Sequence, residues 1–153
     1  MGLDQYLYAR KYYSKYCNDE DKTDFTKLLA MSKVENYLVT TDVGHQSVHL
    51  MVKVGQWRKA HHIHQWIVDN CQDSTDDCRE TYVSREILEE LLATCERVSN
   101  DHSKAQEELP FGWSGDTEDY SQHYYDKLDY TINLIKRVLT MPNEWDFCYS
   151  SSW

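Results

Sequence analysis

The stretch that decides the fold is GQWRKAHHIHQWIVDN, residues 55–70. Apolar side chains recur along it at steps of three and four residues, a spacing that places side chains on one face of an α-helix. We therefore predict one amphipathic helix over 55–70, with its apolar face buried. That face is expected to carry Trp57, Ala60, Ile63 or His64, Ile67 and Cys71.

The residues before this helix favour strands. Residues 3–10, LDQYLYAR, place leucines on one side and tyrosines on the other, and residues 47–54, SVHLMVKV, alternate in the same way. Such alternation is typical of half-buried strands. Between them, residues 14–24 are polar and predict a loop, whereas residues 25–40 are ambiguous, with a helix favoured in the first half and a strand in the second. The inward side of the second strand is expected to carry Val48, Leu50, Val52 and Val54.

The residues after it favour two more helices and a last strand. A loop over 72–83 leads to Ser84, whose hydroxyl is a typical N-cap for a helix that continues to Val98. A long loop over 99–116 follows, and the third helix begins near Asp116 or Thr117 and ends before Pro142. The ending, EWDFCYSSSW, alternates like a strand. The chain is therefore predicted to be one α+β domain over 1–153, a small, mostly antiparallel sheet with three main helices on one face.

Composition excludes several classes of function. The net charge of -10 disfavours direct binding to nucleic acid, where a positive surface supplies most of the affinity. The five cysteines are odd in number and form no CxxC pair, and we find no signal peptide, so we expect reduced thiols and a cytoplasmic protein. No apolar run is long enough to span a membrane, and position 6 is Tyr where a myristoylation signal has Ser or Thr.

The first candidate site is the beginning of the predicted helix. Arg58 and Lys59 stand in its first turn, where the helix dipole favours acids. Residues that contradict such local preferences often belong to functional sites. Two cations beside helix amides favour an anion such as phosphate, and Trp57 and Trp66 offer surfaces on which a ring can stack. The alternative is that both cations pair with acids of the chain and both tryptophans belong to the core.

The second candidate site is FGWSGDTEDYSQHYYDK, residues 111–127. Its glycines give backbone freedom, Trp113 can close over a cleft, and Tyr124 and Tyr125 follow at the start of the third helix. This pattern suits a lid over a nucleotide-sized pocket, and it equally suits a protein interface.

Common catalytic motifs are absent from the sequence. We find no GxGxxG, GxxxxGK[ST], GxSxG or HExxH pattern. His61 and His64 share helical spacing and could bind a metal together with His45, Asp76 or Asp77, but nothing in the spacing demands it. We therefore expect no metal and no cofactor.

Five segments together resemble a family of small bacteriophage proteins. They are MGLDQYLYARK (1–11), VGQWRKAHHIHQWIVDN (54–70), DDCRETYVSREILEELL (76–92), GDTEDYSQHYYDKLDYTI (115–132) and WDFCYSSSW (145–153). The resemblance covers most of the chain except the regions near 18–47 and 99–111. The positions that match the family are Asp4, Trp57, Arg58, Lys59, His64, Trp66, Tyr82, Ser84, Tyr124, Tyr125, Ser151, Ser152 and Trp153.

The resemblance implies a phage accessory protein that counters host defence, either by inhibiting a protein or by capturing a nucleotide signal. Our leading hypothesis is a protein that binds a small anionic, nucleotide-like ligand in the host cytoplasm without turning it over. Homo-oligomerisation is left open. The ligand is expected to contact Trp57, Arg58, Lys59, His64, Trp66, Tyr82, Ser84, Trp113, Tyr124 and Tyr125.

Two alternatives belong to other classes of function. The first is an acidic inhibitor of a host nucleic-acid enzyme, which would use the acid- and tyrosine-rich face from Asp116 to Asp129. The second is a metal-dependent phosphodiesterase that would use His61, His64 and the Asp76/Asp77 pair.

Overall fold

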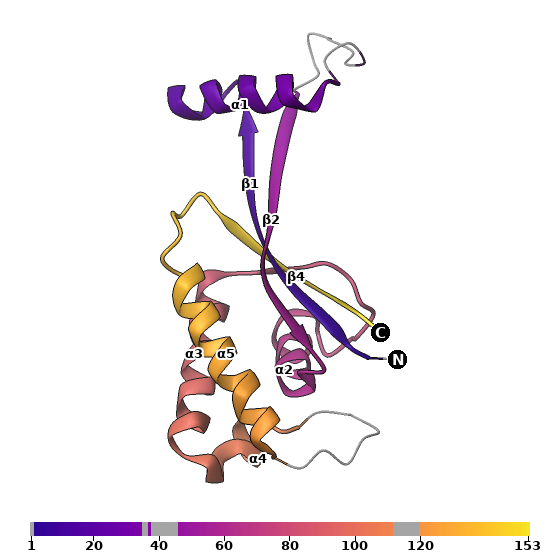
Figure 1. Ribbon diagram of the computed structural model, residues 1–153, viewed down its shortest axis with the longest axis vertical. Helices are drawn as coiled ribbons and strands as arrows, with labels where there is room; N and C mark the ends of the chain where they lie inside the picture. The colour runs from indigo at the N-terminus through magenta and orange to yellow at the C-terminus, as the bar shows by residue number, and fades with distance from the viewer. Residues whose placement is uncertain (1, 35–36, 38–45, 112–119) are drawn as a thin grey trace. The chain divides into compact units, whose positions relative to one another are not determined.

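The computed structural model describes residues 2–34, 37, 46–111 and 120–153. Within these residues the chain forms one four-stranded antiparallel sheet, in the order β2-β1-β4-β3 (Figure 1). In the one pair whose register is described, Tyr82 of β3 lies opposite Cys148 of β4. The strands are β1 (Asp4–Ser14), β2 (Ser47–Arg58), β3 (Thr81–Val83) and β4 (Asp146–Ser152).

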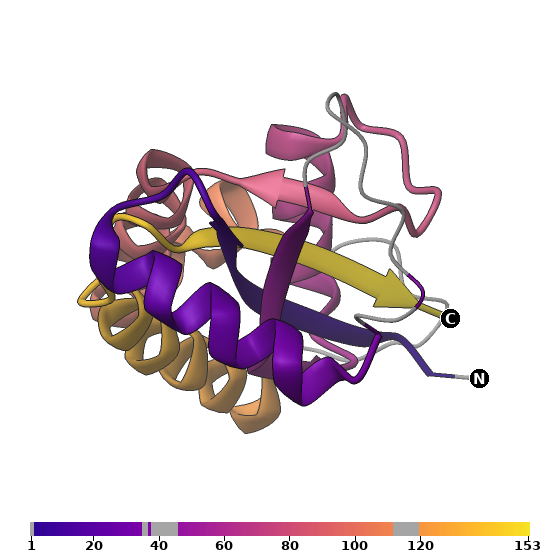
Figure 2. The ribbon, with the colours of Figure 1, turned by 90° about the horizontal axis from the view of Figure 1, so that it is seen from above.

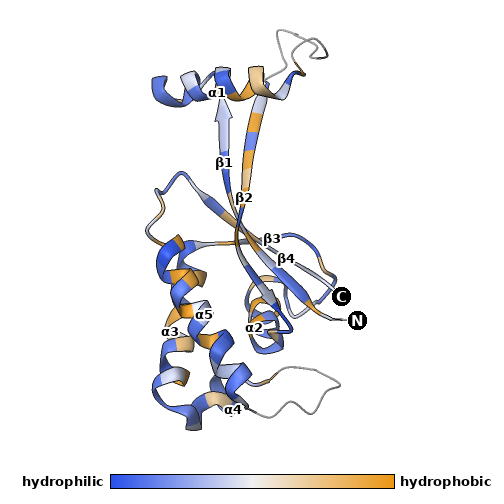
Figure 3. Cartoon of the chain, viewed as in Figure 1, coloured by the Kyte–Doolittle hydropathy of each residue, from blue (hydrophilic) through white to orange (hydrophobic). Residues whose placement is uncertain are grey.

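Helices account for most of the remaining described residues. Hydrophobic and hydrophilic residues are mixed along α3 and α5, as expected of helices with one buried face (Figure 3). The helices are α1 (Asp19–Ser32), α2 (His61–Cys71), α3 (Arg85–Asn100), the 3-10 helix η2 (His102–Lys104), α4 (Ala105–Glu108) and α5 (Gln122–Val138).

The chain divides into two compact units, and the division passes through strands β1 and β2. One unit comprises Met1–Ala9 and Lys53–Trp153, and the other comprises Arg10–Val52. Inside the second unit, Asn18 caps α1 by accepting a 2.9 Å hydrogen bond from the amide of Asp21. The Asp21 carboxylate in turn pairs with Lys11 at 2.8 Å. The single domain predicted over 1–153 stays a prediction.

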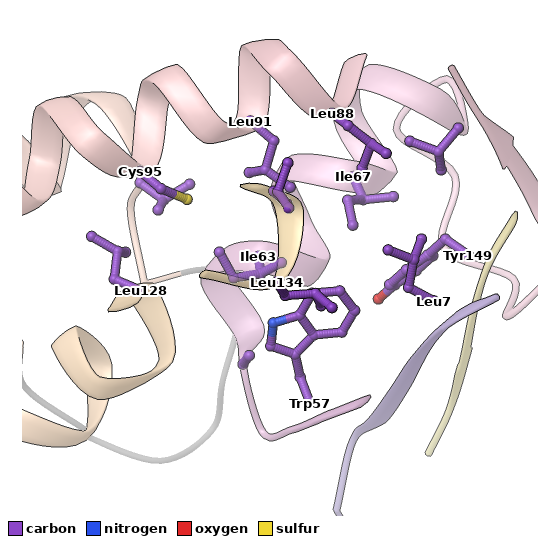
Figure 4. Packing of buried hydrophobic residues seen from close by; sticks show 14 of the residues in the cluster. Leu7, Trp57, Ile63, Ile67, Leu88, Leu91, Cys95, Leu128, Leu134 and Tyr149 are labelled. Carbon is purple, nitrogen blue, oxygen red and sulfur yellow. The ribbon is translucent and has the colours of Figure 1, made fainter. Parts of the chain in front are cut away.

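The core of the larger unit lies between its strands and α2, α3 and α5. The inward side of β1 alternates as predicted, with Leu7 and Ala9 buried, and the Trp57 indole lies among side chains from several elements (Figure 4). Figure 2 shows the strands from above, with β4 between β1 and β3. The α+β class predicted from the sequence is confirmed. Other buried members of this core are Ile63, Ile67, Val83, Leu88, Leu91, Cys95, Val98, Leu128, Leu134, Ile135, Phe147 and Tyr149.

The prediction of a helix over 55–70 is wrong in its first part. Strand β2 continues to Arg58, and α2 begins only at His61. Gly55 and Trp57 are buried while the residues between and after them are exposed, which is the period of a strand. A Cβ atom at position 55 would overlap Cδ2 of Leu134, so glycine allows that side chain to pack close to the strand. Arg58 and Lys59 therefore precede the helix instead of standing in its first turn.

Four smaller expectations are corrected. Part of the predicted loop over 14–24 is the first turn of α1, in which Asp19, Glu20 and Asp21 complement the helix dipole. The long loop predicted over 99–116 contains the end of α3, then η2 and α4. The last residues of the predicted loop over 72–83 form β3, and Val52, expected inward, is exposed. Most of the ambiguous strand within 25–40, and the expected helix start at 116–117, lie outside the described residues.

Candidate functional site

The beginning of α2 is fixed by a clamp from β1. The buried side chain of Gln5 donates to the carbonyl of Ala60 and accepts from its amide, both at 3.1 Å. Ala60 is the N-cap residue of α2 but its side chain cannot accept a hydrogen bond, and the first turn, which is wholly described, contains no acid. No side chain therefore caps that turn, in which His61 is partly exposed and His62 and Ile63 are buried.

Three cationic side chains gather at this end of α2. Lys59 immediately precedes the N-cap, and its backbone has φ 54°, in the left-handed region. The carbonyl of Lys59 accepts a 2.8 Å hydrogen bond from Nζ of Lys127 on α5. A methyl group built on Gly2 would lie 3.5 Å from Cε of Lys59 and 4.0 Å from Nε of Arg58, so both side chains pass over Gly2.

Arg58 is exposed to solvent. Its side chain is 76% exposed, and Nε lies 3.9 Å from the carboxylate of Asp4. An exposed pair at this distance contributes little to stability, so the guanidinium can exchange this partner for a ligand anion.

Aromatic surface lies beside the same helix end. Trp153 is 50% exposed, and its ring centroid lies 6.0 Å from that of His61 and 5.7 Å from that of His64. The indole is tilted by 35° against the first histidine and meets the second edge-on. A half-exposed indole next to a cationic helix end can hold a planar ring.

His64 is the centre of a hydrogen-bond chain. Its Nδ1 lies 2.7 Å from the hydroxyl of buried Tyr149, and its Nε2 lies 3.0 Å from the carboxylate of Asp76. An ionised carboxylate can only accept, so Nε2 carries a proton and Nδ1 of a neutral ring accepts from the tyrosine. Burial raises the pKa of Tyr149, against the lowering effect of a hydrogen bond from Gln5. The phenol therefore stays protonated and serves this chain as a donor.

Of the two tryptophans predicted to stack on a ligand, Trp57 lies in the core. Its side chain is only 3% exposed, and Nε1 donates a 2.8 Å hydrogen bond to Oγ1 of Thr131. The indole thus presents no face to a ligand. Trp66 is half-buried and lines two cavities, of about 250 Å³ and about 350 Å³, beside α2.

The remaining predicted residues lie at other places. Tyr82 is exposed on β3 beside a cavity of about 140 Å³. Ser84 is the N-cap of α3 as predicted, and its hydroxyl accepts from the amide of Ile87 at 3.2 Å. Tyr124 is buried and donates to the carbonyl of Leu109 at 2.7 Å, whereas Tyr125 stacks on His102 with centroids 3.9 Å apart. Trp113 lies outside the described residues.

The structure therefore brings together Arg58 and Lys59, which come just before α2, while His64 lies in the first turn of α2 and contacts Trp153. Three residues that sequence reasoning missed complete this group: Gln5, Lys127 and Trp153. The sequence could have indicated Gln5, because it is a polar residue on the otherwise apolar side of a strand. Lys127 carried none, because only the packing of α5 brings it to Lys59.

Two further findings concern the described residues alone. No group of three or more His, Cys, Asp or Glu side chains in them has the arrangement of a metal site. Among the helices found there, none is long and apolar enough to cross a membrane.

Comparison of the chain with protein-family models, with curated proteins and with solved structures finds no match.

Proposed function

We propose that this chain is a binding protein for a small phosphate-bearing ligand that also carries a planar ring, such as a nucleotide. The observation that supports this best is the gathering of Arg58, Lys59 and Lys127 at the uncapped beginning of α2. Helix amides and cationic side chains both attract an anion, and for this reason the N-terminal ends of helices bind phosphate in many folds.

The cations of this site belong to a chain with a net charge of -10, and Asp4 lies 3.9 Å from Arg58, as an exposed pair that a ligand anion can replace. The Gln5 clamp also holds the helix end in place before a ligand arrives. A site that is ordered in advance loses less conformational entropy on binding.

The ring of the ligand would stack on Trp153. This indole replaces Trp57 in the predicted arrangement, because Trp57 lies in the core. His61 and His64, both within 6.0 Å of the indole centroid, would border the bound ring.

The hydrogen bonds of His64 are compatible with binding without turnover. Both of its ring nitrogens already have partners, Tyr149 and Asp76, so the imidazole would have to lose one of them to bind a metal. The phosphodiesterase alternative needs that loss, whereas binding does not. The resemblance to phage proteins gives the proposal its context: in the cytoplasm of an infected host cell, capture would remove a nucleotide signal used in defence.

The direct test is titration calorimetry with inorganic phosphate, linear nucleotides and cyclic nucleotides. We expect nucleotides to bind more tightly than phosphate, and to be recovered unchanged by chromatography. Each lost charge-assisted hydrogen bond is worth about 1.5–3 kcal/mol, so Arg58→Met and Lys127→Met should each weaken binding by about tenfold or more.

Lys27→Met is the matched control, because Lys27 is an exposed lysine of α1 with an acid 3.7 Å away. It removes the same charge without touching the site, and should leave affinity unchanged. The proposal fails if no nucleotide produces saturable heat, or if the control weakens binding as much as the two site variants do.

A further inference from the structure

A cavity of about 650 Å³ is lined by residues of β2 and α5 and by the turn that follows α5. All of its described lining belongs to the larger unit, and the apolar part consists of Val54, Leu134, Val138 and Met141. Pockets that hold small ligands have volumes of about 300–1,000 Å³ and mostly apolar walls with a few polar groups. Apolar walls alone do not identify an occupant, so the polar groups around this cavity decide what it can bind.

One charged residue lies in the described lining, and it is Arg137 near the end of α5. Its side chain is exposed, and its guanidinium has no ion pair and no hydrogen bond in the described part of the chain. Its neighbour Lys136, by contrast, pairs with Glu96 at 2.6 Å. An unpaired guanidinium beside an apolar cavity favours a ligand that joins a carboxylate to an apolar group, because a guanidinium binds a carboxylate through two parallel N–H donors.

The cavity also borders the open edge of the sheet. β2 is the first strand in the order β2-β1-β4-β3, so within the described residues it pairs with β1 alone. The amide of Lys59, just after β2, donates to the carbonyl of Leu3 at 2.7 Å, whereas the amide of Gln56 donates to the hydroxyl of Tyr130 on α5 at 3.1 Å. Alternate residues of an antiparallel strand direct their backbone polar groups to opposite edges. Val54, two residues before Gln56, therefore directs its amide and carbonyl away from β1.

Free N–H and C=O groups at a sheet edge are a template for an added extended chain. The hydroxyl of Tyr130 already accepts from the amide of Gln56, so the open edge beside this cavity is the backbone of Val54. A residue that pairs with Val54 needs one N–H donor and one oxygen acceptor. The edge, the guanidinium and the apolar walls thus ask for three groups in one ligand: an amide, a carboxylate and an apolar side chain.

We propose that this cavity binds the free C-terminal end of a peptide whose last residue is aliphatic. The carboxylate of that residue accepts hydrogen bonds from the guanidinium of Arg137 and from the amide of Val54. Its own amide donates to the carbonyl of Val54, and its side chain occupies the apolar cavity. The bound residue adds one rung to the sheet beyond β2, a mode of recognition in which main-chain pairing gives affinity and a pocket gives specificity.

This inference does not depend on the anion site at the start of α2. It assigns a different ligand to a different set of residues, and its experiment uses neither phosphate nor nucleotides. Failure of one proposal leaves the other as it is.

The test is a nuclear magnetic resonance titration of the whole chain with the tripeptide acetyl-alanyl-alanyl-leucine. We expect a saturable shift of the Val54 amide signal. The same peptide with a C-terminal carboxamide should bind about tenfold more weakly, because it loses a charge-assisted hydrogen bond. Decanoate, which has a carboxylate and an apolar chain but no amide, should also bind more weakly. The proposal is wrong if the free peptide shows no saturable shift, or if either comparison ligand binds as tightly as the free peptide.

Arg137→Met tests the carboxylate contact and should weaken binding of the free peptide by about tenfold or more. The matched control is Lys136→Met, which removes a cation from the adjacent position of α5, outside the cavity lining. It should leave the affinity unchanged. Equal losses in the two variants would mean that the peptide responds only to the net charge of the helix, and would overturn the proposal.

Val54→Pro tests the edge contact. Proline is tolerated in an edge strand where its missing N–H would face outward, so this variant should fold and lose only the donor to the peptide. We expect it to bind severalfold more weakly than Val54→Ala, which keeps the amide. Equal affinities of the two variants would overturn the proposal. Should the proline variant not fold, an unshifted Val54 amide in the saturated parent chain would contradict the proposal by itself.

Discussion

Gln5 and Ala60 exchange two hydrogen bonds of 3.1 Å, which join β1 to the residue before α2 across 55 positions of sequence. Both residues are buried, so water cannot replace either bond. The amide side chain thus pairs both polar backbone groups of Ala60 and sets where the helix begins.

Replacing Gln5 by Met keeps the length of the side chain and removes both hydrogen bonds. The amide of Ala60 then stays buried without a partner, at about 1–3 kcal/mol, whereas its carbonyl keeps the 3.0 Å hydrogen bond from the amide of His64. We expect the free energy of unfolding to fall by about 2 kcal/mol, as measured by urea denaturation. A loss below about 1 kcal/mol would show that the clamp is not what pairs these groups.

Tyr149→Phe tests the hydrogen bonds that join Tyr149, His64 and Asp76. The variant keeps the ring in the core but removes the hydroxyl that lies 2.7 Å from Nδ1, so a buried nitrogen loses its partner. We expect a loss of about 1–3 kcal/mol in the free energy of unfolding. The control is Tyr130→Phe, which removes the hydroxyl of an exposed tyrosine and should cost less. Phe147→Leu cannot serve as the control, because it changes the packing volume of the core. Equal losses in both tyrosine variants would contradict a special role for the Tyr149 hydroxyl.

The sequence predicts local structure well wherever the side-chain period is unambiguous. Ser84 caps α3, and β1 buries its odd-numbered side from Gln5 to Ala9. The prediction fails at 55–60, because Trp57, Ala60 and Ile63 are three residues apart and so fit a helix. The alternating burial of Gly55 and Trp57, and the position of Leu134 beside Gly55, depend on packing between residues distant in sequence.

The candidate site, too, could be predicted only in part, because contacts between residues distant in sequence assemble it. Arg58 and Lys59 were found because they are adjacent and conspicuous in the sequence. Their partner Lys127 is 68 positions from Lys59 and enters the site only through the packing of α5. Trp57 was assigned to a ligand because composition cannot distinguish an indole that stacks on a ligand from one that hydrogen-bonds Thr131 in the core.

His62 should make stability depend on pH below its ordinary pKa. Its pKa is 6.5 in the unfolded chain and is lowered to about 3 by burial, then by Lys127 and His61. Above pH 6.5 both states are neutral at this position. As pH falls from 6.5 towards 3, only the unfolded chain takes up the proton, so folding loses about 1.4 kcal/mol per pH unit.

His62→Phe removes this contribution. Urea denaturation between pH 7 and pH 4.5 should therefore show a shallower loss of stability in the variant than in the parent chain. The other histidines contribute equally to both proteins, so the difference between the two slopes reports His62 alone. Parallel slopes would mean that the buried imidazole takes up its proton in the folded state as readily as in the unfolded one.

Lys59 allows side-chain and backbone effects to be separated at the proposed anion site. At φ 54° a residue with a Cβ atom is strained by about 1 kcal/mol, whereas glycine is not. Lys59→Gly removes the cation and this strain together, but it also makes the unfolded chain more flexible, so the free energy of unfolding should change by less than about 1 kcal/mol. Lys59→Ala removes the cation and keeps the strain. We expect both variants to lose about the same affinity for nucleotides by calorimetry, with glycine at least as stable as alanine. If the glycine variant keeps the parent's affinity, Lys59 serves only the turn before α2, and the anion must be held by other groups.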